Sequence, residues 1–478
     1  MFKAQNLTNL KSNMSGNPTT PPVSTSGRLQ PICYRMHPDR RLLDGGCGSS
    51  DCDHCQHAES EESGHVHEVP PCLLGLQHHT TIGYDGLTRV AMMITPDCGG
   101  SFRDQAWEAV STIRAILRQQ GEPMAVTVQT VFVAEAADVP VARQIFDAAY
   151  GEEMPLTLFV VQPPCGGVGI AIEAWAISTR TVSVGYHGPH LLTLEHDGIR
   201  WIHASAGTLN LGKRTAYEQS AEAFAALGKV LSGVHASFTD VVRVWLYQGN
   251  ITEEEEDGTE RYRELNRART DFFENYDFAT NPLAATAHGH AVYPASTGIG
   301  TLEHGLITTC LAVQTDRKDV RVLSLENPQQ TSAFDYPKEY SRKSPKFSRA
   351  MAMRLGNHLT TWVSGTASIV NAETVHPGDV AKQTEQTLDN IEKLIAAENF
   401  TRQGWDDCGA TLADLAKVRV YVKHAKDFEA CRAVCERRLG RIPAIYAQAD
   451  VCRPDLLVEI EGVAFSPIPR RLPDPPTP

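Results

Sequence analysis

The chain has no long apolar run and no excess of positive charge. None of its 478 residues lie in a stretch near the roughly 18–20 apolar residues that a membrane-spanning helix requires. The first 16 residues also lack the apolar core of a signal peptide. Lys and Arg number 44 against 57 Asp and Glu, which gives a formal net charge of -13, whereas nucleic-acid-binding surfaces are basic. We therefore predict a cytoplasmic protein whose partners include neither membrane nor nucleic acid.

The chain also lacks the paired cysteine motifs of a disulfide framework or a complete zinc site. Most of its twelve cysteines stand singly, and Cys310, Cys431 and Cys435 lie in apolar segments, as buried reduced thiols do. Cys52-Asp-His-Cys55 has the spacing of half a zinc site, but no second such pair follows. We predict a disordered or Cys/His-rich arm over 1–72, with zinc binding left open, and a proline-rich tail over 467–478. No metal or cofactor is predicted for the functional site.

Between these ends the sequence repeats one pattern of helix, strand, helix and strand. In the third copy, Val380, Leu388 and Ile391 have the spacing of one helix face within residues 379–398. A strand at 412–422, a helix at 427–439 and a strand at 456–465 complete this copy. Two earlier copies follow the same order. Each unit measures roughly 100–130 residues, a normal domain size.

The repeat predicts an α+β fold of three tandem units, at 73–185, 186–335 and 336–466. Each unit should pack two helices on one face of a mixed sheet, which leaves the other face uncovered. Three such units can cover one another around a pseudo-threefold axis, with clefts between them. We therefore predict an intrachain pseudo-trimer, present as a monomer or a homo-oligomer.

The last predicted strand carries two carboxylates. Glu459 and Glu461 alternate with Val458 and Ile460, so both carboxylates lie on one face of the strand. That face is either exposed to solvent or buried, in which case the carboxylates have a functional role. We expect Glu461 to be a solvated neighbour of Glu459, with a supporting role as the alternative.

The third copy resembles the RidA/YjgF family over 363–370, 383–398, 412–422 and 456–462. The resemblance implies a chorismate-mutase-like fold and ligand sites between units. It also implies that the three subunits of the family's homotrimer correspond to three units of this single chain. The family's deaminases hold a substrate carboxylate with an arginine, 14 residues before the glutamate that corresponds to Glu459. Ile445 stands in that position here, and in the first copy Thr157 and Ala171 replace the arginine and the glutamate. The usual deamination is therefore disfavoured.

A closer resemblance covers about 31–80 and 170–466. The runs 293–313, 323–350 and 364–400, with their ENP and TVHPGDV motifs and the LLVEIEG motif at the end, are similar to the chorismatase family. The resemblance implies hydrolysis of chorismate to pyruvate and either a cyclohexadiene diol acid or a hydroxybenzoate. Residues 80–170 form a fuller first unit than this family implies, and their role stays open.

Cleavage of an enol-pyruvyl ether by water requires protonation of the enol-ether methylene carbon. The acid must hold its proton near neutral pH, and burial in a dry cleft gives a glutamate that property. The resemblance assigns this role to Glu459. The substrate is a chorismate-like dicarboxylate, and we expect two of Arg243, Arg263, Arg269 and Arg349 to bind its carboxylates. Further predicted binding residues are Tyr247, Thr297, Gly298, Ser364 and Gly365.

Two other functions remain open at this point. The chain could be a RidA-like enamine or imine deaminase, or a RidA-like protein that binds a small ligand without catalysis. Cys452 precedes the last strand, but no paired histidine motif marks it as a nucleophile. The choice between the two chorismate products depends on cleft shape and water access, which the sequence does not reveal.

Overall fold

The computed structural model describes residues 78–468 except 85, 98, 209–213, 280, 282, 285–290 and 337–342. The predicted arm over 1–72, with its zinc question, lies outside these residues, as does most of the predicted tail over 467–478. Within the described part, no helix is long and apolar enough to cross a membrane. The cysteines described there are all free thiols.

The first unit is a five-stranded sheet with two helices. Its strand order is β1-β2-β5-β3-β4, with β3 and β4 parallel. The elements are β1 (His79–Tyr84), β2 (Leu87–Ile94), α1 (Phe102–Gln119), β3 (Met124–Val133), α2 (Val139–Tyr150), β4 (Leu156–Val161) and β5 (Ile170–Ser178).

The second unit is a six-stranded sheet of order β10-β9-β11-β8-β7-β6, also with two helices. The elements are β6 (Ser183–Tyr186), β7 (Leu191–His196), β8 (Ile199–Gly207), α3 (Ala216–Ser232), β9 (Val241–Gly249), α4 (Arg261–Phe273), β10 (Ala295–Thr301) and β11 (Leu306–Thr315).

The third unit has a sheet of order β12-β13-β14-β19-β17-β18 and a separate pair, β15 and β16. The elements are β12 (Arg321–Leu325), β13 (Ala350–Leu355), β14 (His358–Ala367), β15 (Ile369–Val370), β16 (Glu373–Thr374), α5 (Val380–Ile395), α6 (Ala397–Arg402), β17 (Leu415–Val422), α7 (Phe428–Leu439), β18 (Ala444–Gln448) and β19 (Val458–Pro467). Because β12 pairs with β13, this sheet begins before the predicted boundary at 335/336.

Local sequence signals explain where the helices begin. Ser101 caps α1 and Thr215 caps α3, and in each case an acidic side chain three residues later returns the hydrogen bond. In α5, Val380, Leu388 and Ile391 are buried, as their spacing predicted. The mixed α+β class predicted from the sequence is confirmed.

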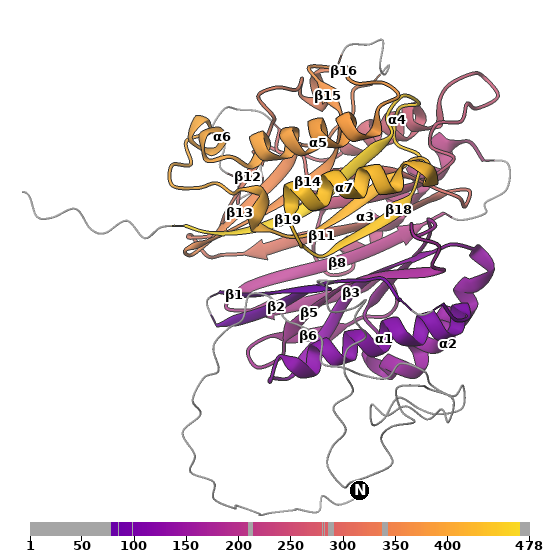
Figure 1. The fold of residues 1–478 in the computed structure, drawn as a ribbon. Coiled ribbons are helices and arrows are strands. Elements are labelled where there is room, and N and C mark those ends of the chain that lie inside the picture. The colour runs from indigo at the N-terminus through magenta and orange to yellow at the C-terminus, as the bar shows by residue number, and fades with distance from the viewer. Residues whose placement is uncertain are drawn as a thin grey trace, which may run out of the picture.

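Each sheet buries one face against its own helices, and the other faces of all three sheets meet in the middle. Three hydrophobic clusters fill the sheet-to-helix layers, and a fourth draws residues from all three sheets. In Figure 1, α1 and α2 cover the outer face of the first sheet, and α5 and α7 cover the opposite side of the molecule. The sheets touch through β10 and β14, β4 and β8, and β18 with β2 and β5. The edge strand of each unit thus lies against the next unit.

Each of the three sheets has a β-bulge at the same place, so equivalent residues of β19, β11 and β5 can be identified. The ladder shifts beside Ala464 in β19, Ala312 in β11 and Ala176 in β5. The residues five positions earlier in these strands are Glu459, Ile307 and Ala171. Within the described residues, the carboxylate is therefore present at one of the three equivalent positions.

Candidate active site

A cavity of about 330 Å³ lies between the second and third units and contains Glu459. Helix α4 and strand β10 line it from the second unit, and β14, β15, β16 and the loop at 452–455 line it from the third. Among its lining residues are Tyr262, Arg263, Asn266, Arg269, Gly298, Tyr336, Arg349, Gly365, Cys452, Arg453 and Glu459. The cavity thus joins segments that are up to 200 residues apart in the sequence.

The strand alternation of β19 directs Glu459 into this cavity. Val458 and Ile460 belong to the cluster beneath the helices, so Glu459 points to the other face, where it is 4 % exposed. The ladder between β14 and β19 is irregular between Val363 and Thr366, which brings Gly365 against Glu459. A Cβ atom at Gly365 would overlap Oε1 of Glu459. A glycine is therefore needed at position 365 for this carboxyl to keep its place.

The surroundings of Glu459 keep its carboxyl group protonated. Burial raises the pKa of Glu459 to about 8, and the negative charge of Glu461 adds to the increase. The positive charges of Arg243 and Arg349 oppose it and do not cancel it. A carboxyl with this pKa carries its proton at neutral pH, as a general acid must.

Two buried arginines border the same cavity with unused hydrogen-bond donors. Arg269 is 3 % exposed, and its guanidinium donates to Asn266 and, at 3.4 Å, to Oγ of Ser296. Arg349 is 5 % exposed and donates to Oη of Tyr336 at 2.6 Å. The Nε atoms of both arginines are buried without a partner. A buried donor without an acceptor is costly, so an anionic ligand that accepts from these arginines would relieve that cost.

The other predicted residues divide between lining the cavity and supporting it. Gly298 lines the cavity, and Arg263 does so with a half-exposed side chain 3.5 Å from Glu260. Thr297 accepts a hydrogen bond from the backbone N–H of Gly365 at 2.9 Å. Ser364 accepts one from the backbone N–H of Ser296 at 2.8 Å, which ties the two units together at this point.

Sequence reasoning missed several residues that line the cavity. Tyr262 and Asn266 lie on the same face of α4 as Arg269, at helical spacing. That spacing could have identified them once Arg269 was chosen. Tyr336 and Arg453 come from loops, where no periodicity marks a shared face.

Arg243 and Tyr247 do not line this cavity. Both lie on the face of β9 that points to the centre of the molecule, where Arg243 is 2.5 Å from Glu461 and the hydroxyl of Tyr247 bonds to Arg419. Their predicted place in the substrate cavity therefore needs correction. Alternation placed the two side chains on one face, but the sequence did not show which space that face borders.

The expectation that Glu461 is solvated is wrong. Glu461 is 1 % exposed, and it accepts hydrogen bonds from Arg243 and, at 3.1 Å, from Nε1 of Trp245. Arg419 lies 3.1 Å from Oε1 of Glu461, the oxygen that accepts from Trp245. Burial alone would raise the pKa of Glu461, but Arg419 and Arg243 outweigh burial and lower it. Two glutamates on the same face of β19, separated by Ile460, are thus one protonated and one ionised.

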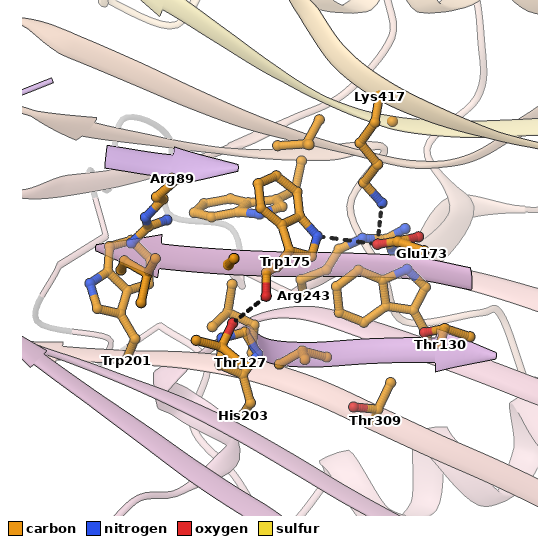
Figure 2. Close-up of a pocket in the computed structure, with 18 of the residues that line it drawn as sticks. Arg89, Thr127, Thr130, Glu173, Trp175, Trp201, His203, Arg243, Thr309 and Lys417 are labelled. Carbon is orange, nitrogen blue, oxygen red and sulfur yellow. Dashed lines mark hydrogen bonds and ion pairs between the residues drawn. The ribbon is translucent and has the colours of Figure 1, made fainter. Parts of the chain in front are cut away.

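The first unit supplies a second buried carboxylate to the same network. Glu173 on β5 lies 2.6 Å from Nζ of Lys417 and also binds Nε of Arg419 (Figure 2). Burial alone would raise the pKa of Glu173, but Arg419 and Lys417 outweigh burial and lower this pKa to about 2. Arg419 therefore bridges Glu173 of the first unit and Glu461 beside the candidate acid.

We expect the Glu173→Gln variant to be less stable by about 3–5 kcal/mol, because it leaves Lys417 and Arg419 buried without a full counter-charge. The free energy of unfolding in urea measures this loss. The Glu385→Gln variant is the matched control, since Glu385 pairs with Arg437 and Arg438 at the surface. We expect it to lose about 1 kcal/mol or less. Equal losses in the two variants would contradict a buried role for Glu173.

Ile445, in the position of the deaminase arginine, does not face Glu459. Its strand, β18, lies against β2 and β5 of the first unit. Strand β10 of the second unit lies near Glu459. Thr297 of β10 pairs with Trp245, in the same way that Ile445 of β18 pairs with Arg419 in the third unit. Thr297 is therefore the second unit's equivalent of Ile445. Ile445 and Glu459 therefore do not share a cleft, because each cleft joins two different units. In the unit that faces Glu459, the position of the deaminase arginine is held by the uncharged Thr297.

Two family models match the chain. One, described as chorismatase FkbO/Hyg5-like, N-terminal, matches residues 173–312, and one described as endoribonuclease L-PSP matches residues 342–466. A chorismatase of Streptomyces rapamycinicus is 35% identical over 276 residues, which cover 56% of this chain and 77% of that protein. The chain belongs to the chorismatase family.

Other comparisons agree with membership of the chorismatase family. A 3-hydroxybenzoate synthase of Streptomyces hygroscopicus is 32% identical over 279 residues, which cover 57% of this chain and 76% of that protein. A crystal structure of a chorismatase superposes with a TM-score of 0.57 at 24% identity, covering 79% of this chain and 98% of the other. At 24% identity, the similarity to this crystal structure is evidence for the fold alone. As a member of the chorismatase family, the chain is an enzyme.

Proposed function

We propose that this enzyme cleaves the enol-pyruvyl ether of chorismate, releasing pyruvate and a six-membered-ring carboxylate. The observation that carries the proposal is a buried Glu459, whose pKa is raised to about 8, in one cavity with Arg269 and Arg349. Family relatives named chorismatase and 3-hydroxybenzoate synthase support the same substrate. The site offers a protonated carboxyl group and two buried arginines to a dianion.

The two arginines orient the substrate in this proposal. Chorismate carries one carboxylate on its ring and one on its enol-pyruvyl side chain. Arg269 on α4 and Arg349 before β13 each direct a guanidinium at the cavity, and charge-assisted hydrogen bonds fix both position and orientation. Glu459 then stands beside the side chain that reacts.

Glu459 acts as a general acid at carbon. Its proton moves to the enol-ether methylene carbon, the C=C π electrons form the new C–H bond, and positive charge develops on the ether-bearing carbon. Water attacks that carbon and gives a proton back to Glu459. The hydroxyl proton of the resulting hemiketal then passes to the ring oxygen as the bond between carbon and ring oxygen breaks, which gives pyruvate. The ring leaves as a dihydroxycyclohexadiene carboxylate in this sequence. A 3-hydroxybenzoate requires loss of water from the ring as well.

The ionised Glu461 helps to keep Glu459 protonated. Its negative charge raises the pKa of Glu459, while Arg243 and Arg419 hold Glu461 in place. Arg243 thus acts behind the acid and not on the substrate.

We also propose that the three units form a closed pseudo-trimer with one chorismate site. The cyclic contacts between the sheets and the central cluster support this arrangement. Ile307 and Ala171 stand at the positions equivalent to Glu459, so the other two clefts have no acid at this position. The proposal retains the predicted units 73–185, 186–335 and 336–466, except that β6 is assigned to the second and β12 to the third.

Pyruvate release from chorismate tests the proposal. Lactate dehydrogenase and NADH report pyruvate as a loss of absorbance, and chromatography identifies the ring product. Chorismate-dependent pyruvate from the purified chain supports the proposal. No pyruvate from folded protein contradicts it, and release of ammonia from 2-aminoacrylate would favour a RidA-like deaminase instead.

The rate should depend on pH through the proton on Glu459. Because the acid form is active and its pKa in the free enzyme is about 8, we expect kcat/KM to be level below pH 8 and to fall about tenfold per pH unit above it. In the Glu461→Gln variant the neighbouring negative charge is gone, so the fall should begin at lower pH. A wild-type rate that rises between pH 7 and 9 would contradict an acid role for Glu459.

A further inference from the structure

A second cavity lies at the centre of the molecule, between the three sheets (Figure 2). It shares no lining residue with the cavity around Glu459. Strands from all three units line it, and the first unit contributes Arg89, Thr127, Glu173 and Trp175. This space is therefore built with the help of the unit that lies largely outside the matched family segments.

The central cavity has more positive than negative charge. Its lining holds the cations Arg89, Arg243, Lys417 and Arg419, but only the carboxylates Glu173 and Glu461. The two carboxylates are engaged by Arg243, Lys417 and Arg419. Burial and the nearby Arg89 lower the pKa of His203 to about 3, so this imidazole is neutral.

Arg89 is the cation of this cavity without an acidic partner among the described residues. Its Nε atom is buried without a hydrogen-bond partner, and its guanidinium lies 4.4 Å from the ring centre of Trp201. Figure 2 shows Arg89, Trp201 and His203 at the other end of the cavity from Glu173 and Lys417. An anion at this end would accept from Arg89 without competing with an existing carboxylate.

Aromatic side chains make the rest of this end flat and apolar. Trp201 and Trp362 are 2 % and 7 % exposed and meet edge to face, with ring centres 6.4 Å apart. Trp175 lines the same cavity. Indole faces stack on planar conjugated groups, whereas a bare inorganic anion gains nothing from them.

We propose that the central cavity is a second ligand site, which takes a small planar aromatic carboxylate. Arg89 binds the carboxylate, and Trp175, Trp201 and Trp362 contact the ring. The proposal does not depend on the reaction assigned to Glu459, and its test needs no turnover. The paired Glu173 and Glu461 close the far end against a second negative charge.

Tryptophan resonances test the site directly, because four of the six tryptophans line the central cavity and none lines the Glu459 cavity. The full chain labelled with 5-fluorotryptophan is titrated with benzoate and followed by fluorine NMR, with assignments from single Trp→Phe variants. We expect benzoate to shift the resonances of Trp201 and Trp362 and to leave Trp107 and Trp405 unchanged. Binding without any shift of the cavity resonances would overturn the proposal.

Variants of Arg89 separate a specific site from general attraction. Arg89→Gln should weaken benzoate binding at Trp201 and Trp362 at least tenfold, and Arg89→Lys should weaken it less. Should Arg89→Gln not fold, Trp201→Leu, followed at Trp362, tests the ring contact of the same site and should also weaken benzoate binding. Unchanged affinity in these variants, or displacement of benzoate by equimolar sulfate, would overturn the assignment to an aromatic carboxylate.

Discussion

Replacing Glu459 with glutamine is expected to lower kcat for pyruvate release from chorismate by about 10²–10⁴-fold, the usual contribution of a positioned general acid. Glutamine has nearly the shape of glutamic acid, so it fits against Gly365 as the native side chain does. It carries no acidic proton for the methylene carbon. Steady-state rates from the coupled pyruvate assay measure the effect.

A matched variant distinguishes lost chemistry from lost structure. Glu459→Asp keeps an acid but withdraws it by one methylene, so its rate should lie between those of the wild type and Glu459→Gln. Circular dichroism and the unfolding midpoint should be close to those of the wild type in both variants. A Glu459→Gln enzyme with the full rate would exclude this residue as the acid, even if the substrate is correct.

Replacing Arg269 with glutamine is expected to lower kcat/KM for chorismate by at least about 30-fold. Loss of a buried charged partner costs about 2–5 kcal/mol, and each 1.4 kcal/mol corresponds to a factor of ten. Arg269 is buried beside the cavity with its Nε donor unused, so a substrate carboxylate is the partner that the variant would lose. Initial rates over a range of chorismate concentrations give kcat and KM separately.

Arg267 provides the control from the same helix. Its guanidinium lies 2.7 Å from Glu264 and over the ring of Tyr217, outside the cavity. Arg267→Gln should therefore leave kcat/KM within about twofold of the wild type, in line with the small effects of exposed pairs. If both variants lose activity equally, Arg269 acts through helix stability and not through substrate binding.

The local elements were predictable because their signals are local. Helix spacing in 379–398 and strand alternation in 456–465 each depend on neighbouring residues, and the structure has α5 and β19 there. The orientation of Glu459 also followed from alternation with Val458 and Ile460. Its identity as the candidate acid came from the family resemblance, because a pair of carboxylates on a strand is more often solvated.

What the sequence could not show was which units meet at each cleft. The position of Ile445 was found by a distance along the chain, but the residues that line the cleft opposite Glu459 come from β10 and α4 of the preceding unit. Arg243 and Tyr247 were misplaced for the same reason. The expectation that Glu461 is exposed to solvent was wrong because its neutralising partners, Arg243 and Arg419, lie 218 and 42 residues away in the sequence.

The common bulge has a consequence for how this enzyme can change over time. In an assembly of identical subunits, one codon sets the residue at every interface, so all the clefts change together. Here Glu459, Ile307 and Ala171 occupy the same register but are encoded separately. Each interface can therefore drift under its own selection, and the chain needs to preserve an acid at only one of them.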